Sequence, residues 1–204
     1  EEKKRRDAAE KEKAKKAKKA KKIKLAMFRV DQILRIREAV MNIIANRLTD
    51  CYWIDLFSGS GIMSCEALIR HAKKVIAIEK DSKTFKICKA NIQSTAADLS
   101  DCIDVQVLNE DVLRWLKNEV GIESFWQGIE RSKRGFDIAY LDPPYDSPLY
   151  YSVLDALIKG AWLKRGSLVI CEHSSELSLQ APAQWVEEGR RVYGNSALLL
   201  LSPL

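Results

Sequence analysis

Short apolar runs alternate with helix-like segments through most of this chain. Five runs, each bounded by turn-forming or charged residues, predict strands at 52–57, 74–79, 103–108, 136–141 and 167–172. Between them, apolar residues at helical spacing predict helices at 62–72, 82–97, 111–119 and 149–161. Strands that alternate with helices in this way favour a parallel sheet covered by helices on both faces.

The two ends of this pattern differ from its centre. Apolar residues at helical spacing predict a further helix over residues 31–48, before the first strand. Two strand-like runs, 186–193 and 196–201, close the chain and are joined by Gly194-Asn195, a turn that favours an antiparallel hairpin. Residues 120–135 predict a surface insertion anchored by one aromatic residue, Trp126. The predicted fold is therefore a mostly parallel, seven-stranded α/β sheet with an antiparallel C-terminal hairpin.

The basic character of the chain is concentrated in its first residues. The whole chain has a net charge of +6, whereas residues 1–24 hold 13 Lys and Arg against five Asp and Glu, which leaves −2 for the remainder. This Lys/Ala-rich segment has no apolar stripe that could pack on a core. We therefore predict a helical or disordered extension over 1–24 and one domain over 25–204. The extension either binds RNA phosphates, packs into a larger assembly or serves only solubility.

Cysteine usage and hydropathy restrict the class of protein. The five cysteines are scattered and form no C-x-x-C pair, so they predict buried thiols in a reducing compartment. With two histidines in the chain, a metal site is not expected. No apolar run approaches the ~20 residues that cross a bilayer, so a membrane location is not expected. We expect a bacterial cytoplasm, or a plastid or mitochondrion if a leader has been removed before Glu1.

A glycine-rich turn follows the first predicted strand directly. Residues 55–61 read DLFSGSG, and a helix is predicted immediately afterwards. Gly59 and Gly61 would let a ligand approach the backbone at the carboxyl edge of a parallel strand. The turn departs from the full G-x-G-x-x-G pattern, because Ser64 stands at its last glycine position.

Acidic residues end the next two predicted strands. Glu79 closes the second strand, where a carboxylate can accept hydrogen bonds from both hydroxyls of a ribose. Asp111 follows the third strand, where it can accept one from the amino group of an adenine. Each acid alone is more typical of a solvated strand end, but together with the glycine-rich turn they predict an adenosine site.

The tetrapeptide after the fourth strand is the most informative feature of the chain. It reads Asp142-Pro143-Pro144-Tyr145. The two prolines fix φ and remove two backbone donors, which leaves carbonyl groups on a rigid loop. A carboxylate and a carbonyl that accept the two hydrogens of an exocyclic amino group would free its lone pair for attack on an electrophile. Tyr145 would stack on a base that has left its helix.

These residues resemble the motifs of Rossmann-like class I methyltransferases that act on amino groups. A narrower resemblance is to the bacterial small-subunit ribosomal RNA (guanine-N2)-methyltransferase family. It is carried by residues 35–42 (RIREAVMN), 61–68 (GIMSCEAL) and the turn at 193–195, and it extends over residues 30–202.

The resemblance implies a cofactor, a substrate and a role for each site residue. The cofactor is S-adenosylmethionine, and the substrate is ribosomal RNA, free or in an assembling small subunit. A monomer is expected. The implied cofactor residues are Asp55, Phe57, Gly59, Gly61, Glu79, Lys80, Asp111, Val112 and Asp142. The implied catalytic residues are Asp142, Pro143, Pro144 and Tyr145, and the implied RNA contacts are Arg35, Arg37 and Tyr145. Because the body of the chain has a net charge of −2, we further expect Lys73 and Lys74 to add to a local basic face that contacts RNA.

The chain departs from this family at three places. A Lys/Ala-rich segment replaces a strand-rich basic arm, and Val30-Asp31-Gln32 stands where Arg-Pro-Thr is usual. His71 occupies a helix end where glycine is common, which His tolerates at modest strain. Two other functions stay open: methylation of another amine, such as adenine N6, cytosine N4 or a protein amide, and a structural role without catalysis in a large complex.

Overall fold

In this computed structural model the described residues are 34–99, 103–118, 123, 125–144 and 148–204. The chain forms two compact units, Glu1–Val40 and Met41–Leu204. Within the first unit, residues 34–40 are helical. The predicted boundary between residues 24 and 25 lies outside the described residues, as does the basic extension. None of the described helices is long and apolar enough to span a membrane.

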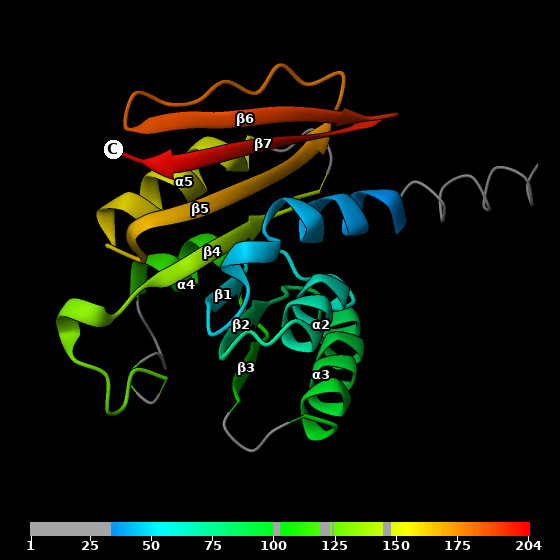
Figure 1. Cartoon of the computed structure of the whole chain (residues 1–204), viewed down its shortest axis with the longest axis vertical. Coiled ribbons are helices and arrows are strands. Elements are labelled where there is room, and N and C mark those ends of the chain that lie inside the picture. The colour runs from blue at the N-terminus through cyan, green and yellow to red at the C-terminus, as the bar shows by residue number, and fades with distance from the viewer. Residues whose placement is uncertain (1–33, 100–102, 119–122, 124, 145–147) are drawn as a thin grey trace, which may run out of the picture. The chain divides into compact units, whose positions relative to one another are not determined.

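The second unit is built on one mixed sheet (Figure 1). Its strand order is β3-β2-β1-β4-β5-β7-β6. The strands from β3 to β5 pair in parallel, whereas β7 pairs antiparallel with both β5 and β6. This confirms the predicted fold. The strands are β1 (Tyr52–Asp55), β2 (Lys74–Ile78), β3 (Asp104–Leu108), β4 (Phe136–Leu141), β5 (Leu163–Ser174), β6 (Trp185–Tyr193) and β7 (Ser196–Pro203).

Helices cover both faces of the parallel part of the sheet. They are α2 (Ile62–Ile69), α3 (Ser82–Ala97), α4 (Val112–Asn118) and α5 (Leu149–Lys159), with short 3-10 helices η1 (Ala45–Arg47) and η2 (Arg131–Lys133). Parallel strands joined through a helix cross over with right-handed geometry. Because the chain runs from β1 outward to β3 and then back to β4 and β5, α2 and α3 lie on one face and α4 and α5 on the other (Figure 1).

Turn chemistry explains where two of these helices begin. Gly61 precedes α2 with φ of 80°, a left-handed conformation that an L side chain rarely adopts. Asp81 precedes α3, and its side chain accepts hydrogen bonds from the backbone N–H groups of Lys83 and Thr84. Such an N-cap satisfies amides that have no partner within the helix. At the end of α2, His71 has φ of 68°.

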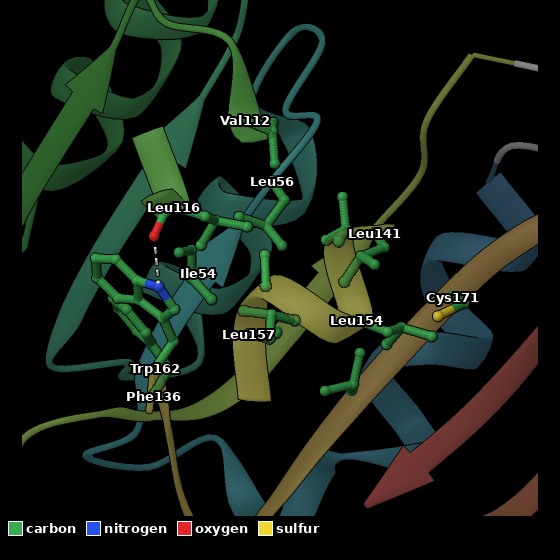
Figure 2. Packing of buried hydrophobic residues seen from close by; sticks show 14 of the residues in the cluster. Ile54, Leu56, Val112, Leu116, Phe136, Leu141, Leu154, Leu157, Trp162 and Cys171 are labelled. Atoms are coloured by element: carbon green, nitrogen blue, oxygen red, sulfur yellow. Dashed lines mark hydrogen bonds between the residues drawn. The ribbon is translucent and has the colours of Figure 1, made fainter. Parts of the chain in front are cut away.

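The main core lies between the sheet and the pair α4 and α5 (Figure 2). Ile54 of β1 and Leu56, which follows this strand, pack there with Leu154 and Leu157 of α5, and all four are fully buried. Trp162 closes one side of this core, where its indole N–H donates to the carbonyl oxygen of Leu116 at 3.1 Å. A buried indole that keeps its hydrogen bond contributes apolar area without leaving a polar atom unsatisfied.

Several element ends differ from the sequence prediction by two or three residues, such as α2, which ends at Ile69, and two segments differ in a way that contacts between elements explain. Strand β5 begins at Leu163, four residues earlier than expected, because Lys164 forms an ion pair of 2.7 Å with Asp137 of β4 and extends the pairing past an irregularity in register. The insertion after α4 is anchored by two aromatic residues, since Phe125 is fully buried beside Trp126. Sequence periodicity does not predict the early start of β5 or the second aromatic anchor, because both depend on contacts between separate segments.

The cysteines that the structure describes are buried free thiols: Cys51, Cys65, Cys88 and Cys171. Burial is the main cause that raises the pKa of Cys51, Cys88 and Cys171 to about 12. These thiols are therefore poor nucleophiles and act as small apolar side chains. Cys102 lies outside the described residues.

Candidate active site

A pocket of about 440 Å³ opens at the carboxyl ends of strands β1 to β4. Parallel strands end at one edge of a sheet, so residues that are distant in sequence meet there. The pocket is lined by Leu56, Phe57, Gly59, Ile78, Glu79, Lys80, Asp111, Val112, Leu113, Asp142, Pro143, Pro144 and Leu149. The structure thus brings together most of the residues that the sequence assigns to a cofactor and catalysis.

The two glycines of the turn after β1 have different surroundings. Gly59 lines the pocket, and a Cβ atom added to it would have no atom within 4 Å. Gly61 does not line the pocket, and an added Cβ would lie 3.0 Å from the Cys88 sulfur and from Ile92. Gly59 therefore leaves room for a ligand, whereas Gly61 lets the start of α2 pack closely against α3.

Glu79 connects the turns that follow β1 and β2. One of its carboxylate oxygens accepts a hydrogen bond from the backbone N–H of Gly59 at 2.9 Å, and the other accepts one from the backbone N–H of Asp81 at 2.7 Å. Each oxygen keeps a further lone pair for a ligand hydroxyl. The carboxylate is thereby held in one orientation at the wall of the pocket.

Asp111 combines a structural contact with a place in the pocket. One carboxylate oxygen accepts a hydrogen bond from the backbone N–H of Arg114 at 3.1 Å, which caps α4. The other accepts one from the ammonium group of Lys80 at 3.0 Å. The bond from Lys80, followed by the one from Arg114, lowers the pKa of Asp111, so this residue offers a charged acceptor beside the pocket.

Asp55 ends β1 directly before Leu56 of the pocket wall, but it is not among the residues that line the pocket. Its side chain is buried and accepts a hydrogen bond from the hydroxyl of Ser64 at 2.9 Å, while its second oxygen has no partner among the described residues. Burial raises the pKa of Asp55 to about 7. An unpaired buried acceptor is costly, so this oxygen fits a ligand that brings a donor or a positive charge.

Asp142 stands at the rim of the pocket, directly after β4. Its side chain is open to the pocket, but the walls of this concavity exclude much of the surrounding water. This loss of hydration, followed by the negative charges of Glu172 and Asp55, raises the pKa of Asp142 to about 8. Pro143 and Pro144 line the pocket beside it, and Tyr145 lies outside the described residues.

The structure does not bring the predicted RNA contacts Lys73 and Lys74 to this pocket. Lys74 begins β2, so both residues lie at the edge opposite the carboxyl ends of the strands. The Lys74 ammonium group forms an ion pair with Asp104 and donates to the carbonyl oxygen of Phe125 at 2.8 Å. An RNA contact at Lys73 or Lys74 would therefore lie away from the pocket. Arg35 and Arg37 lie on the helical residues 34–40 of the first unit.

Residue-by-residue reading of the sequence missed two kinds of site residue. The first kind is the apolar part of the pocket wall: Leu56, Ile78, Leu113 and Leu149. Strand and helix patterns assign such residues to the core, so no separate signal marks them. The second kind is Glu172, whose charge acts on Asp142. A signal existed, because Glu172 ends an apolar run as Glu79 does.

Comparisons with known proteins agree with this geometry. A Haemophilus influenzae protein named ribosomal RNA small subunit methyltransferase D is 28% identical over 151 residues, which cover 74% of this chain and 71% of the relative. The solved structure of yhhF, a proposed methyltransferase of Escherichia coli, superposes with a TM-score of 0.68 at 25% identity, covering 83% of this chain and 85% of that one. For the rRNA methyltransferase aviRa from Streptomyces viridochromogenes the TM-score is 0.58 at 13% identity, with coverage of 81% and 83%.

These similarities establish the fold of the chain, and a match to a family model establishes its family. The model described as conserved hypothetical protein 95 matches residues 17–202, which include the whole sheet up to the last residues of β7. The resemblance to bacterial small-subunit ribosomal RNA methyltransferases is thereby confirmed at the level of the family. The chain belongs to the family described as conserved hypothetical protein 95, and it has the Rossmann-like fold of class I methyltransferases.

Proposed function

We propose that this chain uses S-adenosylmethionine to methylate the exocyclic N2 of a guanine in small-subunit ribosomal RNA. The observation that carries the proposal is the position of Asp142 and its two prolines at the rim of a pocket walled by Glu79 and Asp111. That arrangement joins acceptors for an amino group to acceptors for an adenosine. The name of the Haemophilus influenzae relative supports the choice of ribosomal RNA.

The residues of the pocket fit the proposed cofactor. Glu79 is placed to accept the ribose hydroxyls, and Asp111 is placed to accept the adenine amino group. Leu56, Ile78 and Val112 provide the apolar walls that an adenine ring needs. Gly59 leaves open space beside the turn after β1 for the methionine part, and Asp55, which has one unpaired oxygen, ends the strand before this turn. When bound, S-adenosylmethionine supplies a methyl group that its positive sulfur already activates.

Asp142 is proposed to act on the amino group of the base. Its carboxylate accepts one amino hydrogen, and a carbonyl group of the proline-stiffened loop accepts the other. These hydrogen bonds would turn the nitrogen lone pair out of the ring system. The nitrogen could then form a bond to the methyl carbon while the bond from that carbon to the cofactor sulfur breaks. Asp142 also receives the proton that the methylated amine loses. A pKa raised to about 8 suits this role, because general bases work best when their pKa is near the operating pH.

The proposal is tested by two measurements on the full chain. Isothermal titration with S-adenosylmethionine should show saturable binding. Incubation of total bacterial RNA with labelled cofactor, followed by nucleoside analysis, should give N2-methylguanosine from small-subunit RNA. Labelled N6-methyladenosine or N4-methylcytidine would contradict the choice of base. Absence of any binding heat would favour the structural role without catalysis.

A further inference from the structure

Asp142, directly after β4, and Glu172, on the adjacent strand β5, carry carboxylates at neighbouring positions near the carboxyl ends of both strands. Leu141 of β4 pairs in parallel register with Cys171 of β5, and the next residues along the two strands are Asp142 and Glu172. Neighbouring strands lie about 4.8 Å apart, so the two side chains start from adjacent positions. In the strand order, β5 lies on the far side of β4 from β1, β2 and β3. Asp142 lines the pocket, whereas Glu172 lies next to Asp142 but is not among the residues that line it.

Two tyrosines hold Glu172 in place, one at its carboxylate and one at its backbone. The phenol of Tyr140 donates a hydrogen bond to one carboxylate oxygen. Tyr140 is buried and comes two residues before Asp142, so its side chain leaves β4 on the same face of the sheet. The phenol of Tyr150, on α5, donates to the backbone carbonyl oxygen of Glu172 at 2.6 Å. These contacts fix both the strand position and the side chain.

The second oxygen of Glu172 accepts no hydrogen bond from the described residues, and no described Lys or Arg forms an ion pair with Glu172 or Asp142. Within the described part of the chain, the two acids consequently form a pair of acceptors without a cation. Their mutual repulsion adds to the effect of burial in raising the pKa of Asp142. A partly buried pair of this kind is stabilised by a ligand that brings hydrogen-bond donors.

Bases with an exocyclic amino group differ in the ring nitrogen beside it. In guanine that nitrogen, N1, carries a hydrogen, so N1 and the N2 amino group form two adjacent donors. In adenine and cytosine the corresponding ring nitrogen is an acceptor. A carboxylate opposite that acceptor would leave two acceptors facing each other, and both would be unsatisfied.

Resting on the proposed function, we propose that Glu172 is the residue that selects guanine, because its free oxygen accepts the N1 hydrogen while Asp142 accepts a hydrogen of the N2 amino group. Glu172 thereby distinguishes guanine from adenine and cytosine at the step of base recognition. The Tyr140 hydrogen bond orients the carboxylate for this contact.

The test replaces the acceptor guanine by 2-aminopurine. This base keeps the amino group at C2, but its N1 is an acceptor. The acceptor nucleotide is first located in small-subunit RNA by mapping the labelled methyl group, and the substituted RNA is then made by ligation. We expect the unmodified enzyme to show a kcat/KM about 100-fold or more higher for guanine, as expected when a site loses a required hydrogen bond.

The variant Glu172→Gln should reduce this preference to about tenfold or less, because the new amide can donate to N1 of 2-aminopurine. The loss of the O6 atom is common to both enzymes, so it cancels when their preferences are compared. Glu176→Gln is the matched control, since Glu176 is exposed in the turn after β5 and should leave the preference unchanged. Tyr140→Phe keeps the carboxylate and should keep a preference for guanine.

Three outcomes would overturn the inference. If the unmodified enzyme methylates guanine and 2-aminopurine equally, the proposed function stands and the role of Glu172 is wrong. If folded Glu172→Gln loses activity on both acceptors to the same degree, Glu172 only supports the loop. If the unmodified enzyme methylates neither acceptor in any RNA, the proposed function itself is wrong. The first outcome needs no variant, so the test holds even if a substitution prevents folding.

Discussion

Asp142 is both the proposed catalytic base and an acid whose pKa the surroundings of the pocket raise to about 8. Its carboxylate lies at the rim of the pocket and has no ion-pair partner among the described residues. The loss of hydration inside the pocket, followed by two neighbouring acids, makes its charged form unfavourable. The charge that the proposed catalytic base needs therefore destabilises the folded state. This leads to two separate expectations for the same substitution.

The first expectation concerns activity. Asp142→Asn keeps the size of the side chain but removes a charge and one acceptor position, so methyl transfer should fall by about 100-fold or more. The affinity for S-adenosylmethionine should change by less than about threefold, because Glu79, Asp111 and Gly59 are intact. Single-turnover rates and isothermal titration measure the two quantities. An equal loss of both would mean that Asp142 belongs mainly to the cofactor site.

The second expectation concerns stability. The pKa of Asp142 is raised from 3.8 to about 8, so between these values the folded chain binds more protons at this site than the unfolded chain. The contribution of Asp142 to the free energy of unfolding therefore falls as pH rises from about 4 to about 8. Asp142→Asn should remove this loss, so its Tm should exceed that of the unmodified protein at pH 8 and the difference should shrink toward pH 5.

Thermal unfolding at several pH values measures this difference. Asp155→Asn is a suitable control, because Asp155 lies on α5 and pairs with Lys159 at the surface. Its substitution should not give a difference that grows between pH 5 and pH 8. A stability difference for Asp142→Asn that is independent of pH would contradict the raised pKa.

At the scale of elements, the two glycines of the turn between β1 and α2 have different roles: Gly61 allows close packing of helices, and Gly59 leaves room in the pocket. Gly61 has φ of 80° and lies against Cys88 and Ile92, which are both fully buried on α3. Gly59 has φ of 53° and open space around it. The same substitution at these two positions therefore separates helix packing from ligand binding.

Gly61→Ala should destabilise the fold by about 2–4 kcal/mol, because left-handed strain of about 1–2 kcal/mol adds to overpacking in a buried contact. Gly59→Ala should cost about 1–2 kcal/mol from strain alone, yet it should weaken S-adenosylmethionine binding by at least about tenfold. Denaturant unfolding and calorimetric titration measure the two effects. If Gly59→Ala binds the cofactor normally, the methionine part does not approach this turn.

At the scale of the whole molecule, positive charge and the pocket belong to different parts of the chain. Residues 1–24 carry an excess of eight positive charges, while the remainder has a net charge of −2. A body with this charge gives a weak general attraction to RNA. We therefore expect the extension to provide much of the phosphate binding, although its residues lie outside the described part of the chain.

Deletion of residues 1–24 should weaken RNA binding and reduce the salt dependence of the binding constant. Each phosphate contact that is lost lowers the slope of log K against log salt by about 0.7–0.9. Fluorescence anisotropy at several salt concentrations measures the slope. A full-length variant with six Lys→Gln changes at 15, 16, 18, 19, 21 and 22 should approach the deletion. An unchanged slope in both would leave the extension with a solubilising role.

The sequence by itself determined the alternation of elements and the residues that end the central strands. Periodicity depends on neighbours in the chain, so the helix Ser82–Ala97 and the strand Phe136–Leu141 were predicted with their observed bounds. The same pattern was enough to place Glu79, Asp111 and Asp142 near one another. The physical reason is that parallel strands expose their carboxyl ends at one edge.

Tertiary structure alone decided which side chains meet across elements. Glu172 lies beside Asp142 because β5 pairs with β4 in a register that their separation of 30 positions along the chain does not reveal. The contacts of Lys74 with Asp104 and Phe125, and that of Gly61 with α3, likewise join segments that are distant along the chain. Such contacts depend on strand order and register, which arise from packing of the whole sheet and are not written in any local pattern.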